Sequence, residues 1–174
     1  GLTVRDLVGL GRLPFGSLQK NDMHVEAAII KMELSAFSDR IATQLSGGEQ
    51  ARVLIARALA QDTSILMADE PTASLDPANQ ISTLKIFLEL AQDGRGIMSS
   101  IHDLGLAVRY CTKLALLDRG KLVAFGSADE VLTPDNLQTV FSIEAHYKKT
   151  KEGVIFQPLS VLKKSNKNLL REIP

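Results

Sequence analysis

A change in hydrophobic periodicity near residue 65 constrains the fold of this chain more than any other feature. Before it, apolar residues recur at helical spacing over 51–59. Ile65–Ala68 is instead a short unbroken apolar run that ends in Asp69-Glu70-Pro71, a pattern typical of a parallel strand covered on both faces. A helix followed by such a strand predicts an α/β layer.

The rest of the chain extends this α/β pattern. Apolar residues have helical spacing through much of the first 45 residues, so a helical attachment is expected before the sheet. Asp76 followed by Pro77 is typical of a helix start, because aspartate caps the first turn and proline suits its first position. Further helices are expected over 77–92, 104–111, 127–132 and 135–141, and strands over 97–101, 114–117 and 121–125. The strand at 97–101 is the weakest of these, since Ser99 and Ser100 have low strand propensity.

Composition sets limits on what the chain can be. It has 174 residues with 20 basic and 20 acidic side chains, so its formal net charge is 0 and it lacks the basic field that nonspecific binding to nucleic acid or membrane surfaces needs. Its single cysteine, Cys111, excludes an internal disulfide and a cysteine-cluster metal site. No apolar run approaches the ~18 residues of a membrane span, and the first residues do not have the layout of a signal peptide.

The segment 45–50, Leu-Ser-Gly-Gly-Glu-Gln, is the most informative motif. Ser46 with Glu49 three positions later predicts a capping box at the start of a helix. Gly47 and Gly48 leave the backbone N–H groups of that first turn unobstructed, where the aligned peptide dipoles favour an anion such as a phosphate. A well-capped helix without a ligand explains the segment about equally well.

Two acidic residues follow the apolar strand, at the end where ligands collect in open α/β sheets. There Asp69 is a candidate ligand for Mg²⁺, and Glu70 could orient or deprotonate a water for in-line attack on a phosphoryl group. His102 likewise follows the expected strand at 97–101 and could donate to a terminal phosphate. Purely structural explanations also stay open. Asp69 could cap a turn, His102 could be a structural residue, and Asp76 is adequately explained as a helix cap.

Together these motifs resemble the nucleotide-binding domain of ATP-binding cassette (ABC) proteins, in both order and spacing. The segment 45–50 is similar to the family's signature motif, 65–70 to its Walker B strand, 74–76 (Ser-Leu-Asp) to its D-loop, and His102 to its switch histidine. The resemblance covers residues 1 to about 160. It implies an α/β fold of the P-loop NTPase (RecA-like) class, with an incomplete parallel-sheet core and the ABC α-helical subdomain at the N-terminus.

The resemblance also implies residue roles and two cofactors, ATP and Mg²⁺. Asp69 would hold Mg²⁺, Glu70 would act on the attacking water, and His102 would contact the γ-phosphate. The residues that would grip an ATP bound mainly to the opposite subunit are Ser46, Gly47, Gly48, Glu49, Gln50 and Asp76. In the family two such domains meet head to tail, so a second ATPase subunit, forming a homodimer, is an expected partner.

Two further stretches are similar to ATPase subunits of importers for iron-siderophores, haem or cobalamin. The first consists of residues 3–8 together with residues 11–14, which read Gly-Arg-Leu-Pro. The second consists of residues 128–134, which read Ala-Asp-Glu-Val-Leu-Thr-Pro. This similarity implies transmembrane permease subunits as partners, a solute-binding protein indirectly, and no nucleic acid. It also implies a cytoplasmic subunit that lies peripherally on the inner face of the plasma membrane.

The sequence departs from the family in one respect. It contains neither a Gly-x-x-x-x-Gly-Lys P-loop, whose amides and lysine cradle phosphates, nor a glutamine loop. We therefore expect a fragment of the family's domain that does not turn over ATP alone, with an unpaired strand edge at 97–101 that favours self-association. Its expected parts are a helical subdomain (1–58), the C-terminal part of the RecA-like core (59–143), a small hairpin (144–162) and a tail (163–174).

Two other functions stay open on the sequence. Without a P-loop, the chain could be a non-catalytic assembly fragment, which saturable ATP binding by the isolated chain would exclude. The second alternative is an ABC ATPase of DNA repair or translation. Such proteins usually carry long coiled-coil or linker insertions, so the short uninterrupted run over 46–102 argues against it.

Overall fold

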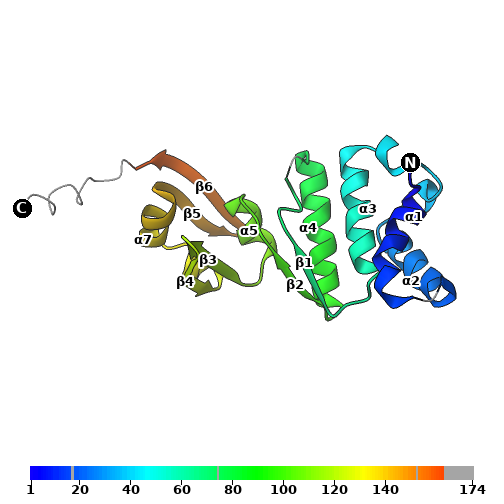
Figure 1. The fold of residues 1–174 in the computed structure, drawn as a ribbon. Coiled ribbons are helices and arrows are strands. Elements are labelled where there is room, and N and C mark those ends of the chain that lie inside the picture. Colours follow the sequence, from blue (N-terminus) through cyan, green and yellow to red (C-terminus); the bar gives the residue numbers. More distant parts are fainter. Residues whose placement is uncertain (17, 74, 152, 163–174) are drawn as a thin grey trace, which may run out of the picture. The chain divides into compact units, whose positions relative to one another are not determined.

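The computed structural model describes residues 1–162 except Ser17, Ser74 and Glu152, and it does not describe the side chains of 18–21. The expected tail at 163–174 therefore lies outside the described residues. The chain divides into two compact units, Gly1–Ile101 and His102–Pro174. Figure 1 shows that helices lead into β1, α4 and β2 in the first unit, whereas short helices alternate with hairpins in the second.

The helical part of the first unit forms where the sequence predicts it. Its elements are α1 (Val4–Gly9), a 3₁₀ helix (Leu10–Phe15), α2 (Leu18–Lys31), 3₁₀ turns at Ser35–Phe37 and Ala42–Gln44, and α3 (Gly47–Leu59). Thr3 begins α1 by accepting the Asp6 N–H at 3.1 Å, as part of a capping box. α3 packs on α1 and α2 (Figure 1). The most deeply buried large side chains of this part are Val4, Val8, Ile29, Met32, Leu34 and Val53.

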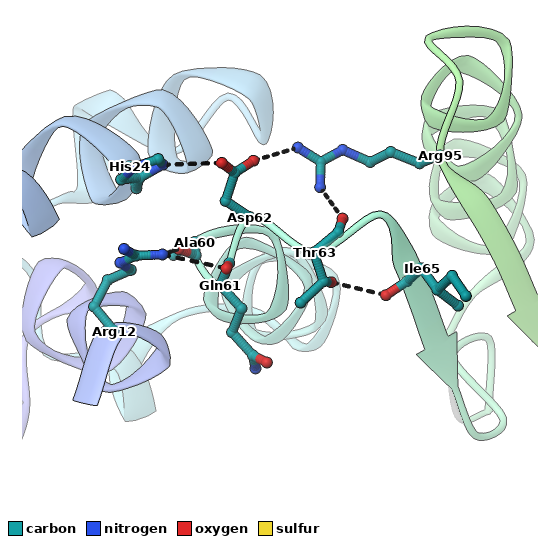
Figure 2. Close-up of polar contacts among 8 residues, drawn as sticks. All are labelled: Arg12, His24, Ala60, Gln61, Asp62, Thr63, Ile65 and Arg95. Carbon is teal, nitrogen blue, oxygen red and sulfur yellow. Dashed lines mark hydrogen bonds and ion pairs between the residues drawn. The ribbon is translucent and has the colours of Figure 1, made fainter. Parts of the chain in front are cut away.

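A buried arginine closes the end of α3 (Figure 2). Arg12, from the 3₁₀ helix after α1, donates through Nη1 to the carbonyl oxygens of Ala60 and Gln61, at 3.0 and 3.2 Å. The last carbonyls of a helix have no partner within it, so these bonds satisfy groups that burial would otherwise leave unpaired. The contact fixes the 3₁₀ helix against the C-terminal end of α3.

Asp62 continues this junction toward the sheet. With a φ of 54° it lies in the left-handed region and turns the chain from α3 toward β1. Its carboxylate accepts from Arg95 Nη2 at 3.1 Å and lies 3.7 Å from His24 Nδ1 (Figure 2). Arg95 Nη1 also donates to the Thr63 carbonyl oxygen at 2.6 Å. The approach to β1 is thereby tied to α2 and to the residue that precedes β2.

The core of the first unit is a parallel strand pair joined by a helix. β1 (Ile65–Ala68) pairs with β2 (Gly96–Ser99), and α4 (Pro77–Gln92) connects them. As predicted, α4 begins at Asp76, which accepts the Asn79 N–H, and has proline in its first turn. Among the described residues β2 pairs only with β1, so its other edge is unpaired, in agreement with the prediction.

One face of this strand pair is exposed, so the prediction that β1 is covered on both faces is wrong for the described residues. Leu66 is buried, whereas Ile65 and Met67 are 61% and 72% exposed. Side chains alternate between the two faces of a strand. Leu84 and Phe87 of α4 are buried like Leu66, so one face of the strand pair is covered. An unbroken apolar run therefore does not require two covered faces within this part of the chain.

The second unit consists of short elements around a small apolar core. They are α5 (Leu104–Tyr110), β3 (Leu114–Asp118), β4 (Lys121–Gly126), α6 (Ala128–Val131), α7 (Pro134–Asn136), a π-helical turn (Leu137–Phe141), β5 (Ile143–Thr150) and β6 (Gly153–Val161). β3 pairs antiparallel with β4, and β5 with β6, the latter where the sequence analysis expects a hairpin. The buried core residues are Val108, Leu116, Val131, Leu132 and Leu137. In the part of the chain that is described, neither unit has a helix long and apolar enough to cross a membrane.

Candidate functional site

α3 starts with the predicted capping box. Ser46 Oγ accepts the Glu49 N–H at 3.4 Å, and Glu49 Oε2 accepts from the Ser46 N–H and hydroxyl at 2.8 and 2.7 Å. The side-chain and backbone hydrogen bonds from Ser46 hold the pKa of the Glu49 carboxyl below its ordinary value. A carboxylate at this end also suits the helix dipole. These contacts give Ser46 and Glu49 a capping role, and their contact with a nucleotide stays a prediction.

The two glycines of the motif have different surroundings. Gly47 is exposed, and a Cβ there would meet no atom within 4 Å. Gly48 is buried, and a Cβ there would lie 2.3 Å from Asn79 Oδ1. The first turn of α3 is therefore open at Gly47 and closed by α4 at Gly48.

Asn79 connects this turn to Asp76. It donates to the Asp76 carboxylate from its backbone N–H at 3.0 Å and from Nδ2 at 2.6 Å, and these bonds lower the pKa of the Asp76 carboxyl. The structure thus brings Gly48 and Asp76 together through a residue that the sequence analysis missed. The available signal was the helix-cap spacing, since the residue three positions after an N-cap faces the capping side chain.

Gln50 folds back onto the chain that precedes α3. Its Nε2 donates to the carbonyl oxygen of Leu45 at 2.8 Å, and the Leu45 side chain is buried. This contact fixes the approach to the capping serine. A role for Gln50 in nucleotide binding stays a prediction.

The acidic pair lies at the carboxyl end of β1, as predicted, and a serine from the end of β2 joins it. Ser100 Oγ donates to Asp69 Oδ1 at 2.6 Å and accepts the Glu70 N–H at 2.8 Å. Glu70 has a φ of 46°, in the left-handed region that non-glycine residues rarely adopt. In the sequence, Ser100 stands out only as a residue of low strand propensity. A polar residue at the end of a strand beside an acidic pair was the signal that could have identified it.

This set of donors fits Mg²⁺ as a partly hydrated ion. Mg²⁺ keeps several waters and is usually bound by one or two carboxylates together with substrate phosphates. Asp69 and Glu70 supply adjacent carboxylates, and Ser100 orients one oxygen of Asp69. Among the described residues, no group of three or more His, Cys, Asp or Glu side chains is placed to hold a metal ion. The role of Asp69 as a ligand of Mg²⁺ stays a prediction.

A groove of about 430 Å³ separates α3 from the end of β1. Its walls include Leu54 and Ala58 on one side and Met67, Glu70 and Pro71 on the other. Leu54 and Met67 are largely exposed. Among the described residues, the acidic strand end consequently borders an open space rather than the packed core.

His102 is the first residue of the second unit, whereas the other candidate residues all belong to the first. It directly precedes Asp103, which caps α5 by accepting the Leu106 N–H at 2.9 Å. Contact between His102 and a terminal phosphate stays a prediction. Ser74, in the expected D-loop, lies outside the described residues.

Known proteins resemble this chain over most of its length. A family model for ABC transporter matches residues 1–73. The chain is 43% identical over 143 residues to the cobalamin import ATP-binding protein BtuD of Halobacterium salinarum, which covers 80% of this chain and 36% of that protein. It is 40% identical over 147 residues to the hemin import ATP-binding protein HmuV of Pseudomonas aeruginosa. This match covers 81% of this chain and 58% of that protein. The chain thus spans less than two thirds of the length of these relatives.

Solved structures also match the fold. The chain matches a metal-chelate type ABC transporter in an inward-facing conformation with a TM-score of 0.82 and 28% identity, over 91% of this chain and 67% of that one. It matches the ATP-binding cassette MJ1267 of an ABC transporter, in its ADP conformation, with a TM-score of 0.73. At 23% identity, over 80% of this chain and 62% of that one, the second match shows the fold alone. These matches confirm the predicted α/β fold of the P-loop NTPase class.

Proposed function

We propose that this chain, which belongs to the ABC transporter family, is part of an ATP-binding and ATP-hydrolysing subunit of an importer for an iron complex, haem or cobalamin. The observation that carries this proposal is the acidic pair Asp69-Glu70 at the carboxyl end of β1, in the same unit as the capped, glycine-containing start of α3. The cobalamin and hemin relatives and the metal-chelate type transporter support the class of solute.

In this function the acidic strand end would carry the chemistry. Asp69 would hold Mg²⁺, which neutralises phosphate charge when it is bound with ATP. Glu70 would orient the attacking water and accept its proton, because its carboxylate follows Asp69 and borders the open groove. His102 would donate a hydrogen bond to an oxygen of the terminal phosphate.

The start of α3 would contact a nucleotide held mainly by an opposite subunit. Gly47 leaves the first turn open, at the end of the helix where the peptide dipoles favour an anion. Beside Gly47, the residues proposed for this contact are Ser46, Gly48, Glu49, Gln50 and Asp76. This role requires a second ATPase subunit arranged head to tail, which we propose is a copy of the same protein.

We further propose that the subunit works with transmembrane permease subunits and, through them, with a solute-binding protein. The relatives that are named as import ATP-binding proteins support this assembly. It would place the subunit in the cytoplasm, peripherally on the inner face of the plasma membrane. The formal net charge of 0 supports the absence of a nucleic-acid partner.

A second candidate function is that these 174 residues alone form a non-catalytic fragment. The observation that favours it is that they contain no P-loop. We expect negligible ATP affinity for the isolated chain in a calorimetric titration. Saturable binding that disappears in Asp69→Asn would contradict this expectation.

The substitution Glu70→Gln in a complete subunit tests the leading proposal. Loss of the carboxylate should lower kcat for ATP hydrolysis by about 10²–10⁴-fold while ATP binding persists, because an amide cannot accept the proton of the water. Glu89→Gln, at an exposed position on α4, is the matched control and should leave hydrolysis unchanged. Unchanged hydrolysis in Glu70→Gln would show that another group acts on the water.

A further inference from the structure

One hydroxyl group reaches both members of the acidic pair. Ser100 Oγ donates its proton to Asp69 Oδ1 at 2.6 Å and accepts the Glu70 N–H at 2.8 Å. The Ser100 N–H donates to the Ala68 carbonyl oxygen at 3.1 Å, which places the serine directly beside the last residue of β1. The serine is therefore held by the backbone and in turn holds two groups of the site.

The backbone at Glu70 needs such support. Its φ of 46° is a conformation that a side chain with a Cβ disfavours. Two hydrogen bonds hold the peptide groups of Glu70 in place: its N–H donates to Ser100 Oγ, and its carbonyl oxygen accepts the Ala73 N–H at 3.0 Å. Since the backbone conformation sets the direction of the side chain, the bond that the Glu70 N–H donates to Ser100 also affects where the Glu70 carboxylate points.

We propose that Ser100 is a positioning residue for ATP hydrolysis, and this inference rests on the proposed function. By donating to Asp69 it fixes the orientation of the carboxylate proposed to hold Mg²⁺, and by accepting from the Glu70 N–H it fixes the turn that presents the proposed base. A small hydroxyl does both because it is a donor and an acceptor at one atom. Partners that orient the ligands of a metal in this way contribute strongly to its binding and to activity.

Ser99, the last residue of β2, provides a matched control directly beside Ser100. Its Oγ donates to the Ser100 carbonyl oxygen at 3.3 Å rather than to the acidic pair. A change at Ser99 therefore alters the same short segment without removing the bonds that join Ser100 to Asp69 and Glu70. A general effect on β2 should appear in Ser99→Ala as well, whereas an effect on positioning should not.

The first experiment measures ATP hydrolysis by the complete subunit at varied ATP and Mg²⁺ concentrations. Ser100→Ala is expected to lower kcat by about 10–100-fold and to raise the Mg²⁺ concentration that gives half the maximal rate, with a smaller change in KM for ATP. Ser100→Thr, which keeps the hydroxyl, should restore most of the rate, and Ser99→Ala should behave like the unchanged protein. Equal effects of Ser100→Ala and Ser99→Ala, or no rescue by threonine, would overturn the inference.

The second experiment tests the geometry in the 174-residue chain without any ATPase activity. Ser100→Ala should accelerate hydrogen exchange at the Glu70 amide by about two- to tenfold, because that N–H loses its acceptor, whereas Ser99→Ala should not. Unchanged exchange would contradict the arrangement itself. Faster exchange with full hydrolysis in Ser100→Ala would overturn the positioning role alone, since the proposed function is decided separately by Glu70→Gln.

Discussion

The two ends of α3 are closed in opposite ways. At the C-terminal end, Arg12 reaches from 48 residues earlier in the chain to donate to the Ala60 carbonyl oxygen, and its side chain is buried (Figure 2). At the N-terminal end, Ser46 and Glu49 close the turn with their own side chains, three positions apart, at an exposed serine. The C-terminal end is thus closed by a contact distant in the sequence, whereas the N-terminal end has a local cap and packs on α4 only at Gly48 among its two glycines.

This difference separates a buried contact at the C-terminal end of α3 from an accessible position, Gly47, in its first turn. A Cβ on Gly11 would lie 2.1 Å from the Arg57 carbonyl oxygen, whereas a Cβ on Gly47 would meet no atom within 4 Å. The Arg12 guanidinium also lies over the Phe15 ring, 4.0 Å from its centroid. A helix held rigidly at one end can leave its other end open to a ligand without losing its position, which is what a binding site on a fixed element requires.

The largest expected effect comes from filling the close contact at the fixed end. Gly11→Ala places a methyl group against the backbone of α3, which cannot move aside as a flexible side chain would. We expect the first unit to lose about 1–3 kcal/mol or more of its free energy of unfolding. Hydrogen exchange of the α3 amides reports this loss, because those amides open when the first unit unfolds.

The matched substitution at the accessible end is Gly47→Ala. Because a methyl group there enters open space, the same exchange measurement should change by less than about 0.5 kcal/mol. Similar losses for the alanine variants at both glycines would remove the contrast between the two ends.

Removal of the buried guanidinium should have the next largest effect. Arg12→Met keeps much of the side-chain volume but leaves the carbonyl oxygens of Ala60 and Gln61 without their donor, so we expect a loss of about 1.5–3 kcal/mol in the free energy of unfolding. The matched control is Arg5→Met, because Arg5 pairs with Glu26 at 2.6 Å at a half-exposed position. That exposed pair should contribute no more than about 1 kcal/mol. Equal losses in the two variants would show that burial does not distinguish them.

The local cap at the start of α3 should contribute less than Arg12. Ser46→Ala removes the hydroxyl that accepts the Glu49 N–H, and a loss of about 1 kcal/mol is expected. Ser46→Thr retains an acceptor and should recover most of that loss. The measurement is again exchange of the first α3 amides, and a loss in Ser46→Ala as large as that in Arg12→Met would contradict the comparison.

The same contrast explains which features the sequence could predict. The capping box of Ser46 and Glu49 and the cap at Asp76 follow from residues three positions apart, so local chemistry determines them and the structure confirms both. The acidic pair at the end of β1 follows from the place where an apolar run stops, which is also a local property.

Apart from Asn79, which lies three positions after the cap at Asp76, the missed features depend on residues distant in the sequence. Arg12 meets the end of α3 across 48 positions, and Ser100 meets Asp69 across 31. Hydrophobic periodicity and helix-cap spacing do not predict which residues such contacts join, because the fold brings the partners together. The error about β1 has the same origin, since Ile65 and Met67 are apolar and only the arrangement of helices decides which face of the strand is covered.

Acidification should have the smallest of these effects on amide exchange, and it should act on the start of α3 rather than on its C-terminal end. The hydrogen bonds from Ser46 hold the pKa of the Glu49 carboxyl below its ordinary value, so the stabilisation by this carboxylate is complete above the ordinary value and is lost as pH falls through the lowered one. Between about pH 5 and pH 3, exchange at the first amides of α3 should therefore accelerate more in the unchanged chain than in Glu49→Gln, which has no charge there to lose. At the other end, Arg12 donates to backbone carbonyl oxygens rather than to a carboxylate, so the loss caused by Arg12→Met should stay constant. The contrary outcome is that acid accelerates exchange at the first α3 amides equally in Glu49→Gln and in the unchanged chain. That result would show that the Glu49 carboxylate does not stabilise the start of α3.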